Sequence, residues 1–287
     1  MSDLNVCLTH DIDRVRKTHQ YITKDLKMGR WHNLVPLLSG ERPYWTFDDM
    51  AELESRYGAK STIFFLHETI PFKLLSPGTW KLSLGRYSLR EPEIGRLVRR
   101  LDAGGWEIGL HGSYRSYRDE TLLEMEKKML EDVLDNKVSG IRQHYLNLDE
   151  PDTWICQKKA GFSYDASLGR TDISGYKDGR MAPFIDETSR MAVIPLTIME
   201  CCLFNEVGHD KQKALKRAVE WMDHSQENGL YYTILWHQHM LNEKEFPGYR
   251  WVYEEILKEC GRRKALFRLC RDVNVRSEGI RSKNGKA

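Results

Sequence analysis

The sequence lacks the features that mark several large classes of protein. No apolar run approaches the roughly 18 residues of a membrane span. Neither a G-x-G-x-x-G nor a G-x-x-x-x-G-K-[ST] motif occurs, so nothing points to a nucleotide phosphate. The 44 lysines and arginines nearly balance the 42 aspartates and glutamates, giving a net charge of +2. This balance gives no reason to expect nucleic acid or a membrane surface as the main partner.

Cysteine is also sparse, and its spacing is uninformative. The six cysteines form no C-x-x-C pair and no zinc-finger spacing. The first residues lead straight into an apolar run and do not read as a secretory signal. We therefore expect reduced, mostly buried thiols in a cytoplasmic protein.

What is present is a repeated alternation of strand and helix patterns. Apolar runs with strand propensity alternate about seven times with amphipathic segments, which predicts an α/β fold with a parallel sheet and helices outside. A (β/α) barrel fits better than an open sheet, because polar residues recur where strands end. We expect one catalytic domain over residues 1–275 and a basic, disordered tail at 276–287.

The first strand pattern, residues 5–14, ends in an unusual group of polar residues. The sequence Thr-His-Asp-Ile-Asp places Asp11 and Asp13 two residues apart, so in an extended chain both side chains share a face. Two adjacent carboxylates either share a proton or hold a cation. A solvated strand end whose aspartates cap a turn is the plainer interpretation of this stretch alone.

Later strand ends decide between these interpretations. Polar residues follow the other apolar runs at the same relative place: His111, Arg142, His144, Asp165, His237 and His239. One aspartate with two histidines is a usual catalytic zinc shell. A second aspartate, an arginine and a further histidine suit a general base, its partner and a general acid. The recurrence predicts an active site with a bound metal ion.

These motifs resemble those of the polysaccharide deacetylase superfamily, and of its branch linked to bacterial surface-polysaccharide biosynthesis. The resemblance covers residues 5–237 and implies a distorted seven-stranded barrel. It implies that Asp11 is the catalytic base and Asp13 a metal ligand. The Leu-His-Gly-Ser-Tyr-Arg stretch supplies His111 as the second ligand, but Arg115 stands where the superfamily has its second histidine.

The remaining superfamily motifs follow in order along the chain. Arg142-Gln-His-Tyr145 resembles Arg-x-Pro-Tyr, which implies that Arg142 orients the base and that the Tyr145 N–H helps to hold the oxyanion. The stretch around Asp165 resembles the fourth motif. Leu-Trp-His237 resembles the fifth, whose histidine is the general acid.

The third metal ligand must come from elsewhere, because a guanidinium group offers no lone pair. His144 is the preferred candidate: it lies two residues after Arg142, and strand alternation puts both on the face of the site. His239 shares a face with His237 by the same argument and is the alternative, as is water. The metal itself is expected to be a divalent ion, with zinc first.

Several other stretches carry expectations that a structure can check. Thr46-Phe-Asp-Asp spells the superfamily's first motif, but an amphipathic segment follows it, so we expect a helix capped by Thr46. We expect residues 119–135 to form a helix that buries a stripe at Leu122, Met125, Met129 and Val133, and residues 249–273 to be largely helical. Glu200 is expected to make a structural hydrogen bond. Trp236, Trp80 and Tyr145 could stack on sugar rings, although aromatic residues more often fill the core or its rim.

Together these features favour a metal-dependent hydrolase that removes the N-acetyl group from an acetamido sugar or polysaccharide and releases acetate. The sequence leaves two alternatives open. One is a hydrolase of another amide or ester on the same scaffold, and the other is an inactive carbohydrate-binding member. We expect a saccharide partner, with no nucleic acid and no membrane span.

Overall fold

The computed structural model describes residues 3–275 apart from 28, 30 and 35–39. The strands of this described part make one sheet in the order β6-β7-β5-β4-β3-β2-β1-β9-β8, with β10 also paired to β1. Every pairing is parallel except that of β6 with β7. The strand bounds are β1 Asn5–Ile12, β2 Thr62–Leu66, β3 Glu107–Gly112, β4 Gly140–Gln143, β5 Tyr164–Asp165, β6 Phe184–Ile185, β7 Ala192–Val193, β8 Ile198–Met199, β9 Tyr231–Leu235 and β10 Leu266–Phe267.

Strand β1 is the centre of the sheet. All of its residues after Asn5 are buried, as expected of a strand covered on both faces. It pairs with β2 on one side and β9 on the other, and Asp11 stands opposite Phe64 of β2. Because the neighbours are parallel, the carboxyl ends of β1, β2, β3, β4 and β9 meet at one edge.

One chain segment joins the two ends of the strand order. Residues 192–199 begin as β7 beside β5 and end as β8 beside β9. Between these strands the Leu196 N–H donates to the Leu168 carbonyl at 2.8 Å, and the Thr197 N–H donates to the Thr233 carbonyl at 3.0 Å. The sheet therefore curls into a distorted barrel, as the sequence predicted.

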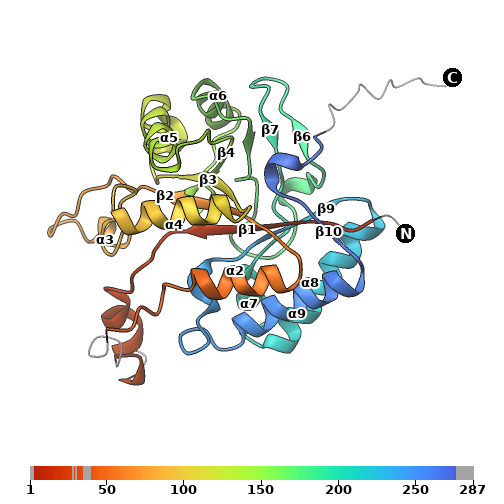
Figure 1. Ribbon diagram of the computed structural model, residues 1–287, viewed down its shortest axis with the longest axis horizontal. Helices are drawn as coiled ribbons and strands as arrows, with labels where there is room; N and C mark the ends of the chain where they lie inside the picture. The colour runs from red at the N-terminus through yellow and green to blue at the C-terminus, as the bar shows by residue number, and fades with distance from the viewer. Residues whose placement is uncertain (1–2, 28, 30, 35–39, 276–287) are drawn as a thin grey trace.

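Helices surround the sheet. Helices α4, α5 and α6 lie on one side of β1 in Figure 1, and α2, α7, α8 and α9 lie on the other. Their bounds are α2 Phe47–Arg56, α3 Pro77–Ser83, α4 Pro92–Ala103, α5 Glu120–Leu134, α6 Asp152–Lys159, α7 Glu200–Glu206, α8 Lys211–Glu227 and α9 Tyr249–Arg262. Within the described residues, no helix combines the length and apolar character needed to cross a bilayer.

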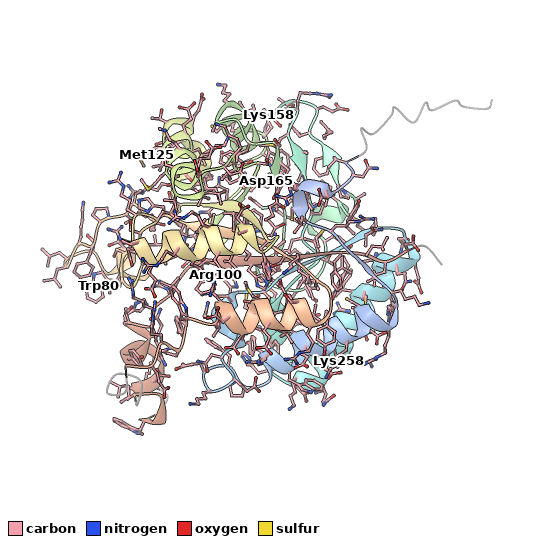
Figure 2. All side chains as sticks on the ribbon, in the orientation of Figure 1. Trp80, Arg100, Met125, Lys158, Asp165 and Lys258 are labelled. Carbon is pink, nitrogen blue, oxygen red and sulfur yellow. The ribbon has the colours of Figure 1, made fainter. Side chains whose placement is uncertain are left out.

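Helix α5 shows where the expected packing was wrong. The helix spans nearly the predicted residues, but its buried face carries Leu123, Glu126, Leu130 and Leu134. Met125, which was expected in the core, is 45% exposed and lies on the outer side of the helix (Figure 2). The sequence has two apolar stripes one residue apart, and the one chosen by the fold includes a glutamate.

Two further expectations need correction. Helix α9 ends at Arg262, and the chain then returns to the sheet as β10 beside β1, so residues 249–273 are only partly helical. Helix α2 does begin after Thr46, but the Thr46 hydroxyl donates to the Gln238 carbonyl at 2.5 Å and does not cap the helix. The predicted disordered tail at 276–287 lies outside the described residues.

Candidate active site

The site lies at the edge where the parallel strands end. Asp11 belongs to β1, His111 to β3 and Arg142 to β4, and each is the residue before the last one of its strand. Asp13 follows β1 directly, and His144 opens a single turn of 3-10 helix after β4. The fold thus brings together polar residues that are far apart in the chain, because parallel strands share one carboxyl edge.

Asp13 is the centre of this group. Its Oδ1 lies 3.1 Å from His111 Nε2 and 3.7 Å from His144 Nε2, and its Oδ2 lies 3.5 Å from His237 Nε2. One carboxylate therefore faces three imidazole rings that come from three different strand ends. Such an arrangement suits a shared cation.

Asp13, His111 and His144 meet the geometric requirement for a metal site. Each offers one ligand atom, and these atoms all lie within 4.8 Å of one another. His111 Nδ1 lies 2.9 Å from the Arg142 carbonyl, so this nitrogen carries the proton and Nε2 keeps its lone pair toward Asp13. Metal-binding histidines are oriented in this way by the hydrogen bond of their other nitrogen. The donor set of one carboxylate and two imidazoles fits a catalytic divalent ion.

The aspartates and histidines of this group shift one another's pKa values. Burial works to raise the pKa of Asp13, but His144, His111 and His237 hold the pKa of this carboxyl well below its usual range. Burial works to lower the pKa of His111, yet Asp11 and Asp13 raise it above its usual value. A metal ion bound here would compete with protons for His111 Nε2.

Asp11 occupies a different environment from Asp13. It is buried, and its Oδ1 accepts a hydrogen bond from Arg142 Nη1 at 3.0 Å. The same guanidinium nitrogen donates to Thr9 Oγ1 at 2.7 Å, while Arg142 Nε donates to the Ala166 carbonyl at 2.8 Å. Asp11 Oδ2 lies 3.8 Å from His111 Nε2. The arginine thus holds one oxygen of this buried carboxylate and leaves the other beside the metal-competent group, which consists of Asp13, His111 and His144.

His237 follows β9 and is held by Glu200, the first residue of α7. The His237 Nδ1 atom lies 2.5 Å from Glu200 Oε1, and Glu200 is fully buried. Burial opposes the charged ring, but Glu200 and Asp13 raise the pKa of His237 well above its usual value. The expected structural hydrogen bond of Glu200 exists, and its partner is the imidazole that the superfamily resemblance makes a general acid.

The turn that carries His144 is strained. Tyr145 and Leu146 have φ values of 60° and 54°, a left-handed conformation that non-glycine residues seldom adopt. This backbone places the 54% exposed Tyr145 ring against His144, with centroids 4.5 Å apart. On its other side His144 Nδ1 lies 3.7 Å from Glu68 Oε2. Strain of this kind is found where a site fixes the backbone.

The structure separates these residues from other candidates. His239 lies against Tyr44, with ring centroids 4.8 Å apart, and is not a member of the metal-competent group formed by the described residues. Arg115 is exposed. Asp165 is buried beneath the site, where its oxygens accept hydrogen bonds from Trp154, Gln157 and Ser167. Burial raises the pKa of Asp165 above its usual value.

Trp80, a suggested sugar-stacking residue, is remote from the sheet. It lies on α3 at the edge of the molecule, and the view separates it widely from Asp165 (Figure 2). Its indole N–H donates to the Lys73 carbonyl at 3.0 Å. Trp236 is fully buried in the core and cannot stack on a sugar. Of the three suggested residues, Tyr145 is the one that lies beside the site, against His144.

Sequence reasoning overlooked Glu68. This residue comes two positions after β2, and its carboxylate accepts hydrogen bonds from the N–H groups of Thr69, Ile70 and Tyr114 while facing His144. The rule that identified the other site residues, a polar side chain just past an apolar strand, would have found it.

Comparison with known proteins gives the fold a context. No family profile matches the sequence, and no curated protein matches it either. Among solved structures, a protein assigned as a polysaccharide deacetylase from Mycobacterium smegmatis shares 16% identity at a TM-score of 0.58, covering 91% of this chain and 84% of its own. Another protein assigned as a polysaccharide deacetylase, from Pseudomonas aeruginosa, shares 13% sequence identity at a TM-score of 0.61, and the match covers 95% of this chain and 90% of that protein. Puue allantoinase shares 12% sequence identity at a TM-score of 0.60, and the match covers 95% of this chain and 89% of the allantoinase. At such low identity these likenesses establish one thing: the chain has the fold of the polysaccharide deacetylases.

Proposed function

We propose that the protein is a metal-dependent amide hydrolase that removes N-acetyl groups from an acetamido saccharide. The observation that carries the proposal is the contrast between two neighbouring aspartates. Asp13 faces three imidazoles, whereas Asp11 is bound by a guanidinium group and leaves one oxygen beside the metal-competent group. One carboxylate is placed to hold a cation and the other to accept a proton.

Asp13, His111 and His144 would hold the metal ion. A divalent ion there supplies Lewis acidity, which polarises an acyl carbonyl and lowers the pKa of water. The chain's own groups supply the proton transfers. Asp11 accepts the proton of the attacking water at Oδ2, because Arg142 occupies Oδ1.

His237 supplies the proton for the leaving amine. Its Nδ1 is held by Glu200, so the ring presents Nε2–H toward Asp13 and the reacting group. The raised pKa keeps this ring protonated at neutral pH, as a general acid requires. The Tyr145 N–H is the proposed additional donor to the developing oxyanion, a contact worth a few kcal/mol in comparable sites. The products are acetate and a free amino sugar.

The decisive test separates base from ligand. Asp11→Asn should retain the metal and lose turnover by roughly 10²–10⁴-fold, the range for removal of general-base catalysis. Asp13→Asn should lose metal and activity together, because it removes the central ligand. The measurements are acetate release from a panel of N-acetylated saccharides and metal content by elemental analysis. Equal metal loss in both variants would reject the assignment of Asp11 as a base.

A non-saccharide amide is the second candidate, because one protein of the same fold is an allantoinase. The panel should therefore include allantoin and simple acetamides. Turnover of these compounds without acetate release from any saccharide would favour this candidate. Metal binding without turnover of any member would favour an inactive carbohydrate-binding protein.

A further inference from the structure

A cavity of about 470 Å³ opens beside the site, within the ~300–1,000 Å³ range of small-ligand pockets. It is built by the connection between β2 and α4, and the residues that line it are His67, Glu68, Thr69, Arg86, Tyr87, Ser88 and Glu91. The proposed catalytic chemistry uses none of its lining directly. The cavity therefore calls for a separate explanation.

Two lining residues connect the cavity to the site. Glu68 has its carboxylate 3.7 Å from His144 Nδ1. The Tyr87 hydroxyl donates to the Ile12 carbonyl at 2.8 Å, between Asp11 and Asp13 in the chain. The wall of the cavity is thus also the wall of the metal-competent group. A group bound in the cavity would be a near neighbour of the reacting one.

The acidic side chains of the cavity are already paired. Glu68 accepts three backbone hydrogen bonds, from Thr69, Ile70 and Tyr114. Glu91 forms an ion pair with Arg16 and accepts the Ser88 N–H at 2.9 Å. The charge of Glu91 is thus balanced by Arg16, and the Glu68 carboxylate, although it keeps its charge, has its oxygens directed at three N–H groups and at His144.

The basic side chains are not neutralised in the same way. Arg86 is exposed, and in the described residues its hydrogen bonds go to two backbone carbonyls, those of Glu68 at 2.9 Å and Ile70 at 2.6 Å. Both bonds use Nη1, so the rest of the guanidinium fork is available. Arg90 is exposed close by, and after burial it is Arg90 and then Arg86 that lower the pKa of His67. The positive charge of two arginines therefore acts on this cavity.

We propose that this cavity is a subsite for an anionic group, a carboxylate or a phosphate, carried by the saccharide next to the sugar that is deacetylated. An arginine fork binds either group through paired charge-assisted hydrogen bonds. The inference rests on the proposed function, since it assumes that a saccharide occupies the site. It assigns to Arg86 the role of main anion-binding residue and to Arg90 a supporting electrostatic role.

The test uses a matched set of compounds with the metal-loaded protein. The neutral compound is the β-linked disaccharide of N-acetylglucosamine. The carboxylate compound is N-acetylglucosamine linked to glucuronic acid, and the phosphate compound is N-acetylglucosamine 1-phosphate. Binding is measured by calorimetry and turnover by acetate release. Wild-type protein should bind at least one anionic compound about tenfold or more tightly than the neutral one, as expected for a charge-assisted contact. Whichever anionic compound, carboxylate or phosphate, gains more affinity over the neutral compound identifies the anion that the subsite prefers.

The variants are Arg86→Gln and Arg90→Gln, with Arg99→Gln as the matched control. Arg99 is also exposed and also donates to a backbone carbonyl, that of Val133 at 2.7 Å, but it does not line the cavity. Arg86→Gln should remove about tenfold of the affinity for the anionic compound, raise KM with little change in kcat, and leave the neutral compound unaffected. Arg90→Gln should have a smaller effect that disappears at high salt. In the described part of the chain the Arg90 side chain makes no hydrogen bond or ion pair, and its backbone N–H, which bonds Ser88, is kept in the variant, so this variant protects the test against misfolding.

The outcomes distinguish this proposal from the function on which it rests. Equal binding of neutral and anionic compounds, or an equal effect of Arg86→Gln on both, overturns the subsite even if acetate is released. Preferential binding of the anionic compound that is lost in Arg86→Gln supports the subsite even if no compound is hydrolysed. In that second case it is the deacetylase function that fails.

Discussion

In the part of the chain that the structure describes, two fully buried glutamates each lie within 2.6 Å of a histidine nitrogen, Glu54 beside His10 and Glu200 beside His237, and the two pairs do different things. His10 Nε2 lies 2.6 Å from Glu54 Oε1, and His10 Nδ1 lies 2.5 Å from the Trp236 carbonyl, so both ring nitrogens are used by the protein. In the second pair only Nδ1 is used, and Nε2 faces Asp13 across 3.5 Å. A closed pair can only hold the fold together, whereas a pair with one open nitrogen can exchange a proton.

The surroundings of the two glutamates support this distinction. Glu54 also accepts hydrogen bonds from Ser61, Trp106 and Tyr253, at 2.9, 2.6 and 2.9 Å. This network joins α2 and α9 to β1, the strand that carries Asp11. Glu200, by contrast, has one buried oxygen, Oε2, with no hydrogen-bond partner in the described structure. A fully satisfied network is rigid, and a partly satisfied one is typical of functional sites.

The largest expected effect comes from replacing the histidine of the His237–Glu200 pair. His237→Gln should lower kcat by roughly 10²–10⁴-fold, because it removes the proposed proton donor to the leaving amine. The protein should stay folded, since the glutamine amide can still donate to the buried Glu200 carboxylate, and kcat is therefore compared per folded molecule. The measurement is acetate release with a saccharide that the wild type hydrolyses. A substrate with an activated leaving group needs no acid and should restore much of the rate, and failure of that rescue would assign His237 another role.

The structural pair should show the opposite response. Glu54→Ala leaves the His10 ring and three donors without their common acceptor in a site closed to solvent. Removing one partner of a buried ion pair costs roughly 3–5 kcal/mol in free energy of unfolding. We expect a loss in this range from denaturant titration, with kcat per folded molecule close to the wild-type value at low temperature. An undiminished stability would mean that the network is not a structural support.

Glu200→Gln is expected to have an intermediate effect and sharpens the comparison through pH. Glu200 raises the pKa of His237, so the charged acid persists to higher pH. Activity that needs protonated His237 is lost as pH rises through this pKa. The variant should therefore lose activity at a lower pH than the wild type, and kcat should fall about 10–100-fold, as for removal of an outer carboxylate partner.

The matched control is Glu206→Gln, which changes the last residue of the same helix. Glu206 bonds Ser174 and Arg217 at the surface and has no contact with His237. Its pH profile should match the wild type. An unshifted alkaline limb in Glu200→Gln would mean that the carboxylate only positions the ring.

The sequence predicted the barrel and most of the site for a physical reason. Parallel strands end at a common edge, so polar residues placed just after apolar runs must converge there, as Asp11, Asp13, His111 and His144 do. Strand alternation also turns His10 away from Asp11 and predicts that it packs or hydrogen-bonds beneath the strand, as it does with Glu54. The sequence does not show which nitrogen of His237 remains open, because that depends on Glu200, which is distant in the chain.

The buried face of helix α5 was also not predictable from the sequence. The stripe containing Met125 is apolar throughout, whereas the stripe containing Leu123 includes Glu126, yet the fold buries the second. Hydrophobic periodicity assigns a glutamate to solvent. Here the Ser113 N–H donates to Glu126 Oε2 at 3.1 Å, just past β3, and this local contact is invisible in a periodic pattern.

Glu126 is another buried glutamate, one with no histidine partner among the described residues, and it provides the prediction of smallest size. Burial raises the pKa of this carboxyl from its ordinary 4.5 to about 8, with Ser113 opposing the shift. In the unfolded chain the group ionises near its ordinary value, so between about pH 5 and pH 8 the unfolded state binds fewer protons than the folded one. The free energy of unfolding must therefore fall as pH rises through this interval.

Glu126→Gln removes this titration while keeping the shape of the side chain. Relative to the wild type, the variant should gain about 1–2 kcal/mol between pH 5 and pH 8.5, less than the full ~1.4 kcal/mol per pKa unit because the folded protein can relax around a charged carboxylate. The measurement is denaturant unfolding at both pH values, with Glu124→Gln on the exposed side of the same helix as the control. The Glu124 variant should show no such change. If the stability difference between Glu126→Gln and wild type is independent of pH, the carboxyl is ionised in the folded state, and a cation or ordered water that compensates its charge must lie behind β3.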